Sequence, residues 1–338
     1  MVNAELAERV VVIDAGYDSY AQEEKILAAA GARLEVFPGD RHDRRGKMEF
    51  ARGACGMFVR WTIVDDEFLR ALPGLRAIVR YGVGHENVDL GAAARRGVRV
   101  SNVQGYANHS VSDHALGLIL ACARGFRVGT DVGFLRAKYT APPAAFVPEL
   151  REMTLGIVGL GRIGGTLCAK AQGLFRRVLA CDPYVPEERF KTLGAIRCEL
   201  GRLLEESDVV SLNCTLTEET RLLIGERALA RLRPTAILIN TARGPVVDEE
   251  ALLRALEAGR LHSAGLDVFR DEPPLEDRDA LLVHPRVVAT GHYAWYSSAS
   301  SRELQRRAAE NMAAMLGGAI PEDCLNSGDS HRFPAGNR

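Results

Sequence analysis

The sequence predicts an α/β protein with two Rossmann-like, doubly wound parallel-sheet domains and a cleft between them. Short apolar runs alternate with helix-compatible segments along nearly the whole chain, which is the pattern of βαβ units on a parallel sheet. The alternation comes in two series, separated by a long helical stretch at 109–123. A length of 338 residues is also typical of two domains.

Each series supplies enough strands for its own sheet. The first has RVVVID (9–14), LEVF (34–37), GMFV (56–59), RAIVR (76–80) and VRVSN (98–102). The second has LGIVGL (155–160), RVLACD (177–182), DVVSLN (208–213), AILIN (236–240), SAGLDVF (263–269) and VVAT (287–290). We expect the last helix, 301–316, to cross back onto the N-terminal unit. This gives one flavodoxin-like domain of residues 1–102 plus 295–338, and a second domain of residues 103–294.

Composition narrows the class of protein. The formal net charge is −1, so no global field favours nucleic acid or an anionic membrane surface. Seven scattered cysteines without a C-x-x-C pair fit reduced thiols and supply no metal spacing. The longest apolar run, 115–123, is too short to cross a bilayer, and the N-terminal segment, which has acidic residues and leads directly into a strand, is not expected to be a signal peptide. We expect a soluble cytoplasmic protein without a metal site.

Two segments lack the alternating pattern. Residues 124–153 are irregular and contain three prolines, which suits a domain-crossing connection or an arm that embraces a partner. The tail 327–338 is polar, with Gly and Pro, and is expected to be disordered.

A dinucleotide site is predicted where the second series begins. Gly159, Gly161 and Gly164 follow a strand and open a helix, so they permit a tight turn, close approach of a diphosphate, and close helix packing. The helix N-terminus offers N–H groups and a positive dipole end to the phosphates. Asp182 ends the next strand, 18 residues after the last glycine, and would accept both ribose hydroxyls and repel a 2′-phosphate. The expected cofactor is NAD(H), with Arg162 reaching the diphosphate.

Three isolated charged residues follow successive strands of the same series. Arg243 lies in NTARGPVVDE, Glu272 in DVFRDEPP and His292 in TGHYAW. Ligands of open parallel sheets bind outside the carboxyl ends of the strands. Together the three side chains supply what carbonyl reduction needs. Arg243 anchors a carboxylate and polarises the carbonyl, His292 gives a proton to the developing alkoxide, and Glu272 holds the imidazole in one tautomer.

These segments resemble those of the D-isomer-specific 2-hydroxyacid dehydrogenase family, over about residues 50 to 326. The matching motifs are RYGVGHENVDL (80–90), SVSDHALGLIL (110–120), GIVGLGRIG (156–164), DPY (182–184), LTEETRLLIG (216–225), NTARGPVVDE (240–249), LDVF..EP (266–273) and His292 with AWYS (294–297). The AWYS ending and Arg80 are most similar to the branch of the C-terminal-binding protein corepressors and their bacterial dehydrogenase relatives. The resemblance implies the roles argued above for Arg243, Glu272 and His292.

The resemblance also implies further contacts. Those with the cofactor fall on Ile163, Cys214, Thr215, Thr241, Ala242, Asp267 and His292, beside the residues of the glycine-rich segment. Those with the substrate fall on Arg80, Val83, Gly84, Arg243 and Trp295. A buried inert thiol is the alternative role for Cys214, and a domain-interface core residue is the alternative for Trp295. The helix 109–123 and the loop after it resemble the family's dimerisation element, so a homodimer is expected.

The chain departs from the usual family pattern at several positions. Gly291 and Thr215 stand where proline is usual, and Glu86 replaces the usual Asp. Gly291 adds backbone freedom beside the predicted catalytic histidine. Arg60 and His85 are additional cations that suit a second acidic group on the substrate, although they could instead bond to backbone or to the other domain.

The leading hypothesis is an NADH-dependent reductase that converts a 2-oxo acid to a D-2-hydroxy acid, with residues 1–102 and 295–338 binding substrate and 103–294 binding NAD. One alternative is an NAD-sensing binding protein with vestigial activity. Another is a reductase for a dicarboxylate or phosphonopyruvate-type substrate. Oxidation of phosphite or formate is a third, and Glu272 argues against formate because formate enzymes of this fold carry Gln there.

Overall fold

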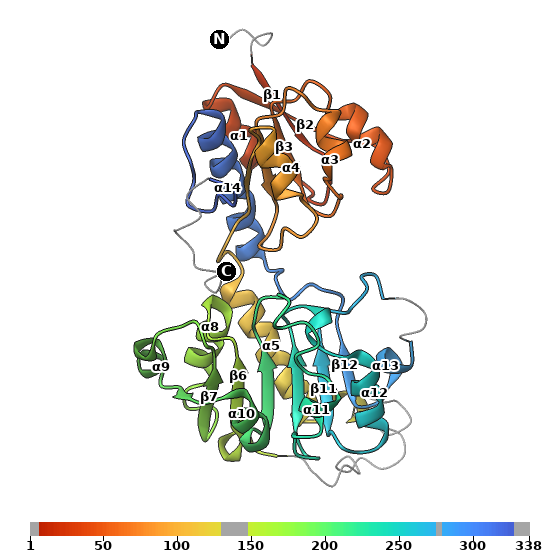
Figure 1. The fold of residues 1–338 in the computed structure, drawn as a ribbon, viewed down its shortest axis with the longest axis vertical. Helices are drawn as coiled ribbons and strands as arrows, with labels where there is room; N and C mark the ends of the chain where they lie inside the picture. The colour runs from red at the N-terminus through yellow and green to blue at the C-terminus, as the bar shows by residue number, and fades with distance from the viewer. Residues whose placement is uncertain (1–6, 130–147, 275–278, 328–338) are drawn as a thin grey trace. The chain divides into compact units, whose positions relative to one another are not determined.

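Two compact units make up the fold, and each contains its own parallel sheet (Figure 1). In the computed structural model, one unit holds the described residues up to Tyr106 together with those from Ser297 onward. The other runs from Ala107 to Tyr296. The prediction of two α/β units, each with a parallel sheet, is thus confirmed. The cleft between the two units stays a prediction.

The structure describes residues 7–129, 148–274 and 279–327. Most of the irregular connection predicted at 124–153 lies outside these residues. So does the tail predicted to be disordered, except for its first residue.

The first unit has a five-stranded sheet in the order β2-β1-β3-β4-β5, which is the flavodoxin-like order. Its strands are β1 (Glu8–Val12), β2 (Ala32–Val36), β3 (Gly56–Val59), β4 (Ala77–Arg80) and β5 (Arg99–Ser101). Its helices are α1 (Ala21–Ala29), α2 (Arg44–Phe50), α3 (Asp66–Arg70), α4 (Leu90–Arg95) and α14 (Ser298–Leu316). The central strand β1 pairs on both sides, with Val10 beside Leu34 and Gly56, and its valines are fully buried. Burial on both faces explains why these strands are continuous apolar runs.

Among the described residues, aspartate side chains cap the N-termini of four helices. The side chains of Asp43, Asp65 and Asp89 accept the backbone N–H three residues on, at 2.8, 3.0 and 2.8 Å, at the starts of α2, α3 and α4. Asp248 does the same for α12 (Glu249–Glu257), at 2.9 Å. Each cap satisfies an N–H that has no partner inside its helix.

The C-terminal helix α14 packs on the first unit, as the sequence predicts. It lies beside α1 (Figure 1) and also contacts β4 and β5. It begins at Ser298, three residues earlier than expected, because Ser297 and Ser300 form a capping box. The Ser300 amide donates to the Ser297 hydroxyl at 3.0 Å, and the Ser297 amide donates to the Ser300 hydroxyl at 2.8 Å.

The second unit has a seven-stranded sheet in the order β12-β11-β10-β9-β6-β7-β8. Its strands are β6 (Thr154–Val158), β7 (Arg177–Cys181), β8 (Ile196–Arg197), β9 (Val209–Leu212), β10 (Ile237–Asn240), β11 (Ser263–Leu266) and β12 (Val287–Ala289). Its helices are α5 (Asn108–Ala123), α6 (Phe126–Gly129), α8 (Arg162–Ala171), α9 (Glu187–Leu193), α10 (Leu200–Glu206), α11 (Glu226–Leu229), α12 and α13 (Asp279–Val283), with 3-10 turns at Leu150–Glu152 and Gly244–Val246. Six of the strands were expected. The seventh, β8, has two exposed residues at the sheet edge and so carries no apolar run.

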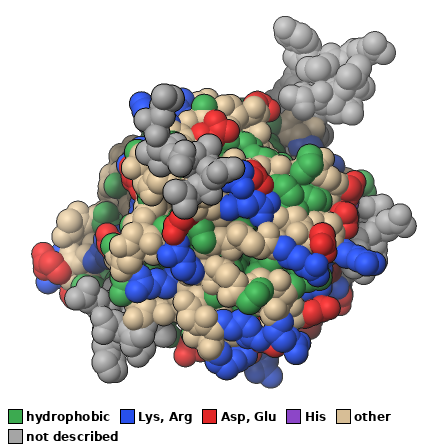
Figure 2. Space-filling model, turned by 90° about the horizontal axis from the view of Figure 1, so that it is seen from above, with side chains coloured by type: hydrophobic (Ala, Val, Ile, Leu, Met, Phe, Trp, Pro, Cys, Tyr) green, Lys and Arg blue, Asp and Glu red, His purple; other side chains and the backbone are tan. Residues whose placement is uncertain are grey.

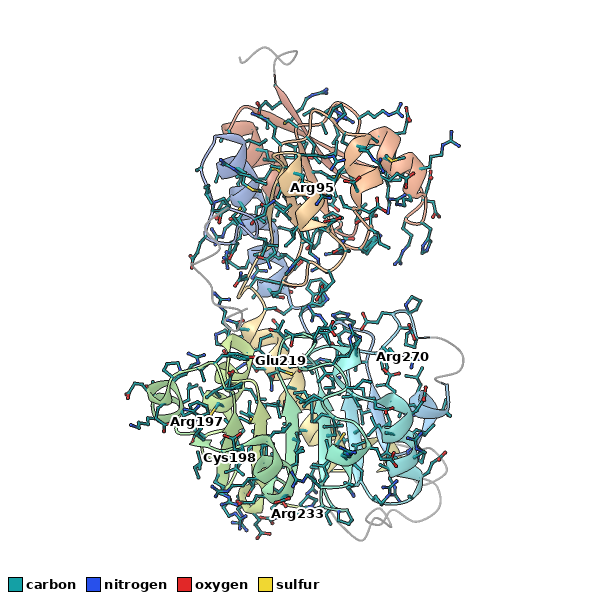
Figure 3. All side chains as sticks on the ribbon, in the orientation of Figure 1. Arg95, Arg197, Cys198, Glu219, Arg233 and Arg270 are labelled. Carbon is teal, nitrogen blue, oxygen red and sulfur yellow. The ribbon has the colours of Figure 1, made fainter. Side chains whose placement is uncertain are left out.

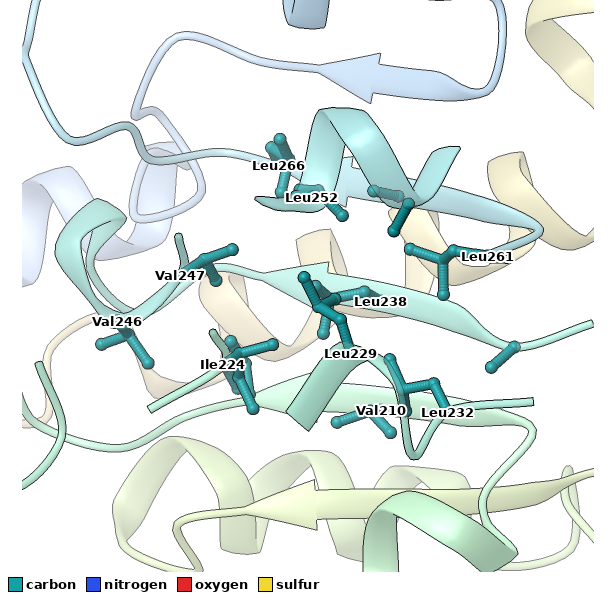
Figure 4. Close-up of a cluster of buried hydrophobic side chains, with 14 of the residues drawn as sticks. Val210, Ile224, Leu229, Leu232, Leu238, Val246, Val247, Leu252, Leu261 and Leu266 are labelled. Atoms are coloured by element: carbon teal, nitrogen blue, oxygen red, sulfur yellow. The ribbon is translucent and has the colours of Figure 1, made fainter. Parts of the chain in front are cut away.

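The strand order of the second unit reverses between β6 and β9, which both lie at the centre of the sheet. Apolar side chains of β9, β10 and α12 form a buried cluster on one face of this sheet, including Val210, Leu238 and Leu252 (Figure 4). A second cluster, which contains residues of α5 and α8, covers strand residues such as Ile157 and Ile239. The buried core therefore supports the centre of the sheet, between β6 and β9, where a doubly wound sheet binds its ligands.

Side chains of both charge signs reach the surface. On the face drawn in Figure 2, basic and acidic side chains are spread among polar and apolar ones, as a net charge of −1 leads one to expect. Of the helices in the described part of the chain, none has the length and apolar character needed to cross a membrane.

Candidate active site

The glycine-rich loop lies between β6 and α8, at the reversal point of the second sheet. Gly159 has a φ of +89°, and a Cβ there would come within 2.8 Å of the backbone of Asn213 and Cys214, which follow β9. A Cβ at Gly164 would lie 2.0 Å from the carbonyl oxygen of Gly159. Gly161 is different, because a Cβ there would meet nothing within 4 Å. Two glycines are therefore required by the protein itself, and the third leaves open space at the start of α8.

These features fit an NAD cofactor. Gly161 precedes α8 without a side-chain cap, so the helix N-terminus faces the open space with its N–H groups and dipole. Asp182, at the end of β7, accepts the Leu160 amide at 2.8 Å through one carboxylate oxygen and the Tyr184 amide at 2.9 Å through the other. Each oxygen keeps acceptor capacity for a ribose hydroxyl. The buried hydroxyl of Thr241, just after β10, has no hydrogen-bond partner among the described residues, as expected where a ligand supplies one.

Substitutions of Gly164 and of Gly161 should distinguish a glycine needed for packing from one needed for cofactor binding. We expect Gly164→Ala to lower the free energy of unfolding by about 1–3 kcal/mol, because its Cβ overlaps the Gly159 carbonyl. Gly161→Ala should change the melting temperature much less and weaken NADH binding about tenfold or more, because its methyl group occupies the space for the diphosphate. Calorimetric titration and thermal melting of both variants check this. The prediction would be contradicted if Gly161→Ala lost as much free energy of unfolding as free energy of NADH binding.

The other residues predicted to bind the cofactor follow neighbouring strands. Cys214 is half-buried behind β9, and burial raises the pKa of its thiol to about 11, so it is a neutral side chain. Thr215 comes next and accepts the Thr220 hydroxyl through its carbonyl at 2.6 Å. Thr241 and Ala242 are buried behind β10. The structure therefore brings these residues to the same edge of the sheet as the glycine-rich loop, because parallel strands end together.

One hydrogen bond links the segment after Asp182 to the loop after β9. The Tyr184 hydroxyl donates to the carboxylate of Glu219, in the loop after β9 (Figure 3). Arg162 and Ile163, the first two residues of α8, are exposed and half-buried respectively. Their predicted contacts with the cofactor stay predictions.

Arg243 follows β10 in an extended conformation, and its Nη1 donates to the Ala242 carbonyl at 2.8 Å. The next residue, Gly244, packs so tightly against the segment after β11 that a Cβ would lie 1.9 Å from the Phe269 backbone. That close approach brings the Arg243 segment beside the loop that carries Glu272.

Glu272 and His292 form a directly hydrogen-bonded pair. One Glu272 oxygen contacts His292 Nδ1, and the other accepts the Phe269 amide at 3.1 Å. Burial alone raises the pKa of Glu272, but the hydrogen bond and charge of His292, the Phe269 amide and the charge of Arg243 together lower it below its usual value. An ionised carboxylate can only accept, so Nδ1 is the donor and Nε2 is the ring nitrogen left for proton exchange.

The pKa of Glu272 sets a pH dependence. Since its pKa is lower in the folded protein, the ionised Glu272 stabilises the fold at neutral pH, and this contribution is lost as pH falls through the lowered pKa. We expect Glu272→Gln to melt at a lower temperature than the wild type at pH 7, with the difference shrinking as the pH falls below the ordinary pKa of a glutamate. Glu257→Gln, exposed at the end of α12, is the control and should show no such trend. A difference for Glu272→Gln that stays constant with pH would contradict the assignment.

Asp267 holds the loop of His292 in place. The backbone carbonyl of Asp267 accepts the His292 amide at 2.8 Å, and its buried carboxylate accepts the amides of Tyr293 and Ala294 at 3.2 and 3.0 Å. The Thr290 hydroxyl also donates to this carboxylate, at 2.6 Å. His292 has a φ of +54°, which is unusual for a residue other than glycine. The freedom expected from Gly291 is therefore restrained, because one aspartate binds three successive amides.

Two further side chains, Trp295 and His114, contact the loop of His292. The Trp295 indole donates to the His292 carbonyl at 3.1 Å, so it braces the same loop, and its predicted lining of a substrate pocket stays a prediction. His114 of α5 contacts Thr290 Oγ1 at 2.9 Å and was not singled out from the sequence. Across the described ranges, no group of three His, Cys, Asp or Glu side chains is arranged to hold a metal.

The first unit carries the other predicted substrate residues at the carboxyl ends of its strands. Arg80 ends β4 and donates from Nη1 to the Tyr81 carbonyl at 2.8 Å. The turn after it contains Gly82, with a φ of +125°, and Val83, whose carbonyl accepts the Asn102 side-chain amide at 2.6 Å. Gly84 is buried beside Val83. This turn is fixed by β5, which precedes Asn102.

Arg60 follows β3 in the first unit. Its guanidinium lies 4.4 Å from the Tyr17 ring centroid and 5.7 Å from that of Trp61. The two aromatic rings restrict the plane of the guanidinium. His85, the other residue suggested for a second acidic group, is half-buried in the turn after Gly84.

Comparison with known proteins shows which family this chain is similar to. A family model described as "D-isomer specific 2-hydroxyacid dehydrogenase, NAD binding domain" matches residues 116–294. A glyoxylate reductase of Korarchaeum cryptofilum is 40% identical over 266 residues, covering 78% of this chain and 80% of the relative. A D-3-phosphoglycerate dehydrogenase of Mycobacterium leprae is 37% identical over 90% of this chain, which spans 57% of that relative's length.

Solved structures agree in fold. The TT0316 protein from Thermus thermophilus has a TM-score of 0.83 at 33% identity, covering 94% of this chain and 99% of the other. A D-lactate dehydrogenase from Aquifex aeolicus, solved with NAD and lactic acid, has a TM-score of 0.84 at 25% identity, with the same coverage. None of these similarities singles out the corepressor branch, which stays a prediction.

Proposed function

Because this chain belongs to the D-isomer specific 2-hydroxyacid dehydrogenase family, we propose that it reduces a 2-oxo acid to a D-2-hydroxy acid with NADH. The observation that carries the proposal is the His292–Glu272 pair, in a loop clamped by Asp267 at the edge of the NAD-binding sheet. The named activities of the relatives, reduction of glyoxylate and dehydrogenation of phosphoglycerate and lactate, all interconvert a 2-oxo and a 2-hydroxy acid.

The chain's own residues account for the proton and the substrate carboxylate. NADH supplies the hydride for the substrate carbonyl carbon. His292 donates a proton from Nε2 to the carbonyl oxygen, while Glu272 keeps the ring oriented through Nδ1. Arg243 presents a guanidinium to the carboxylate and the carbonyl oxygen and stabilises the negative charge that develops there. In the reverse direction, neutral His292 accepts the proton from the hydroxyl group.

A substrate with a second acidic group is the second candidate, and Arg60 favours it. A guanidinium that lies near two aromatic rings at a strand end loses little freedom when it binds an anion. The phosphoglycerate dehydrogenase relatives also act, by name, on a substrate that carries a phosphate beside its carboxylate. Oxaloacetate and phosphonopyruvate represent this class.

A substrate panel tests both candidates. Purified protein is assayed with NADH against glyoxylate, pyruvate, hydroxypyruvate, branched and aromatic 2-oxo acids, oxaloacetate and phosphonopyruvate, with NADPH in parallel. We expect turnover of at least one acid, faster with NADH. If no acid turns over while NADH binds tightly, the reductase proposal fails and an NAD-sensing binding protein is favoured.

Arg60→Gln separates the two candidates. If the substrate has two acidic groups, the KM for it should rise about tenfold or more, with the KM for glyoxylate unchanged. Arg95→Gln, an exposed arginine of α4 (Figure 3), is the matched control. An equal rise of both KM values would show that Arg60 does not recognise a second acidic group.

A further inference from the structure

We propose that Arg189 is a positioning residue for the cofactor, which fixes the glycine-rich loop in the conformation that binds the diphosphate of NAD(H). Arg189 lies in α9, seven residues after Asp182. Its helix begins with acidic residues and looks like a solvent-exposed segment in the sequence. The inference rests on the NAD site of the second unit and adds a residue that no sequence motif marks.

The guanidinium of Arg189 binds two successive carbonyls of the loop. Nε donates to the Leu160 carbonyl and Nη2 to the Gly161 carbonyl, each at 2.7 Å. A Cβ at Gly165 would lie 2.6 Å from Nη2, so the absence of a side chain at Gly165 makes room for the arginine. The glycine pair that follows the loop therefore has two purposes. Gly164 admits the Gly159 backbone, and Gly165 admits Arg189.

This contact, together with the hydrogen bond from the Gly165 amide to the Gly161 carbonyl at 2.9 Å, determines where the loop amides point. In a trans peptide, the carbonyl of one residue and the N–H of the next point in opposite directions. Because the carbonyls of Leu160 and Gly161 face Arg189, the N–H groups of Gly161 and Arg162 point away from it. These are the N–H groups at the start of α8, where an anion binds to a helix N-terminus.

Asp182 completes the restraint from the other side. Its carboxylate accepts the Leu160 amide at 2.8 Å, so Leu160 is held through its N–H by β7 and through its carbonyl by α9. The loop is thus fixed before the cofactor arrives, and less conformational freedom is lost on binding. Arg189 also adds a positive charge beside the glycine-rich loop.

Two variants separate positioning from charge. Arg189→Gln removes both the fork and the charge, whereas Arg189→Lys keeps the charge but cannot donate two parallel bonds. Arg202→Gln, an exposed arginine of α10 in the same unit, removes one charge whose ion pair is with Glu206 of its own helix and is the matched control. Thermal melting establishes that each variant is folded.

The readout is binding, measured by calorimetric titration of NADH and of ADP-ribose, which carries the diphosphate but no nicotinamide. We expect Arg189→Gln to weaken both about tenfold, Arg189→Lys to weaken both nearly as much, and Arg202→Gln to bind like the wild type. In turnover assays the KM for NADH should rise in both Arg189 variants, with kcat unchanged.

Three results would overturn the proposal. Wild-type affinity in Arg189→Gln would remove any role for this residue. Wild-type affinity in Arg189→Lys would show that charge alone suffices. Failure of the wild-type protein itself to bind NADH or ADP-ribose would overturn the NAD site as a whole, which is distinct from the first two results because it does not depend on a variant.

Discussion

Replacing His292 by alanine is expected to lower kcat for the best 2-oxo acid by about 10²–10⁴-fold while changing NADH affinity much less. The reason is geometric. Glu272 holds Nδ1 and the Asp267 clamp holds the loop, so the ring presents Nε2 as its only site for proton exchange. Alanine removes the proton donor without touching the glycine-rich loop. Steady-state kinetics with NADH, together with titration of NADH, measure the two quantities separately.

Controls for this prediction lie in the same loop. Tyr293→Phe removes only an exposed hydroxyl next to the histidine and should retain kcat. Glu272→Gln should lose less activity than His292→Ala, because the amide still orients the ring but no longer stabilises its charged form. If His292→Ala keeps kcat within about tenfold of the wild type, the proton comes from another group and the proposed mechanism is wrong.

The strands were predictable because the sheets are parallel and buried. Strands buried on both faces are uninterrupted apolar runs, and RVVVID or AILIN cannot easily be anything else. The exceptions have physical causes. The edge strand β8 is two residues long and exposed, so nothing in its composition distinguishes it from a loop. The start of α14 was placed too late because serines, which cap helices, look like part of the preceding loop.

The predicted catalytic residues came from their position in the chain. Arg243, Glu272 and His292 are isolated charges just after strands, and parallel strands place such residues at one edge. The structure confirms that Glu272 and His292 contact each other. Their catalytic roles stay predictions.

Asp267, Arg189 and Lys47 show what the sequence could not reveal. The grip of Asp267 on three successive amides depends on how the chain turns after β12. Arg189 and Lys47 lie in charged helical segments that are typical of solvent-exposed faces. Arg189 donates to Gly161, 28 positions away in the chain, and Lys47 donates to Asp14, 33 positions away. Only the tertiary fold brings such charges to these partners.

Lys47→Met is expected to lower the free energy of unfolding of the protein by about 3–5 kcal/mol. Lys47 is 2% exposed and donates from Nζ to Asp14 at 2.7 Å, to the Thr62 hydroxyl at 2.9 Å and to the Arg41 carbonyl. Methionine fills a similar volume but leaves the buried Asp14 without its counter-charge. Urea unfolding of the variant against the wild type measures the loss, and Lys25→Met, exposed on α1, is the matched control.

A double-mutant cycle identifies the cause. Burial alone raises the pKa of Asp14, but its hydrogen bonds with Lys47 and Thr62 and with backbone amides lower it below its usual value. The ionised Asp14 therefore stabilises the fold at neutral pH, and that contribution is lost as pH falls through the lowered pKa. In Asp14→Asn/Lys47→Met no charge is left buried, so the loss should be smaller than the sum of the two single losses. Additive losses would show that the two side chains do not act as an ion pair.

This pair also has a consequence for the proposed substrate site. The second carboxylate oxygen of Asp14 accepts the amides of Arg60, Trp61 and Thr62 at 2.8, 2.9 and 2.9 Å. Asp14 therefore holds the backbone that carries Arg60 in the same way that Asp267 holds the backbone that carries His292. If Arg60 recognises a second acidic group, Lys47→Met should raise the KM for that substrate at temperatures where the variant is still folded, with the KM for glyoxylate unchanged. A loss of stability without this shift in KM would confine Lys47 and Asp14 to a structural role.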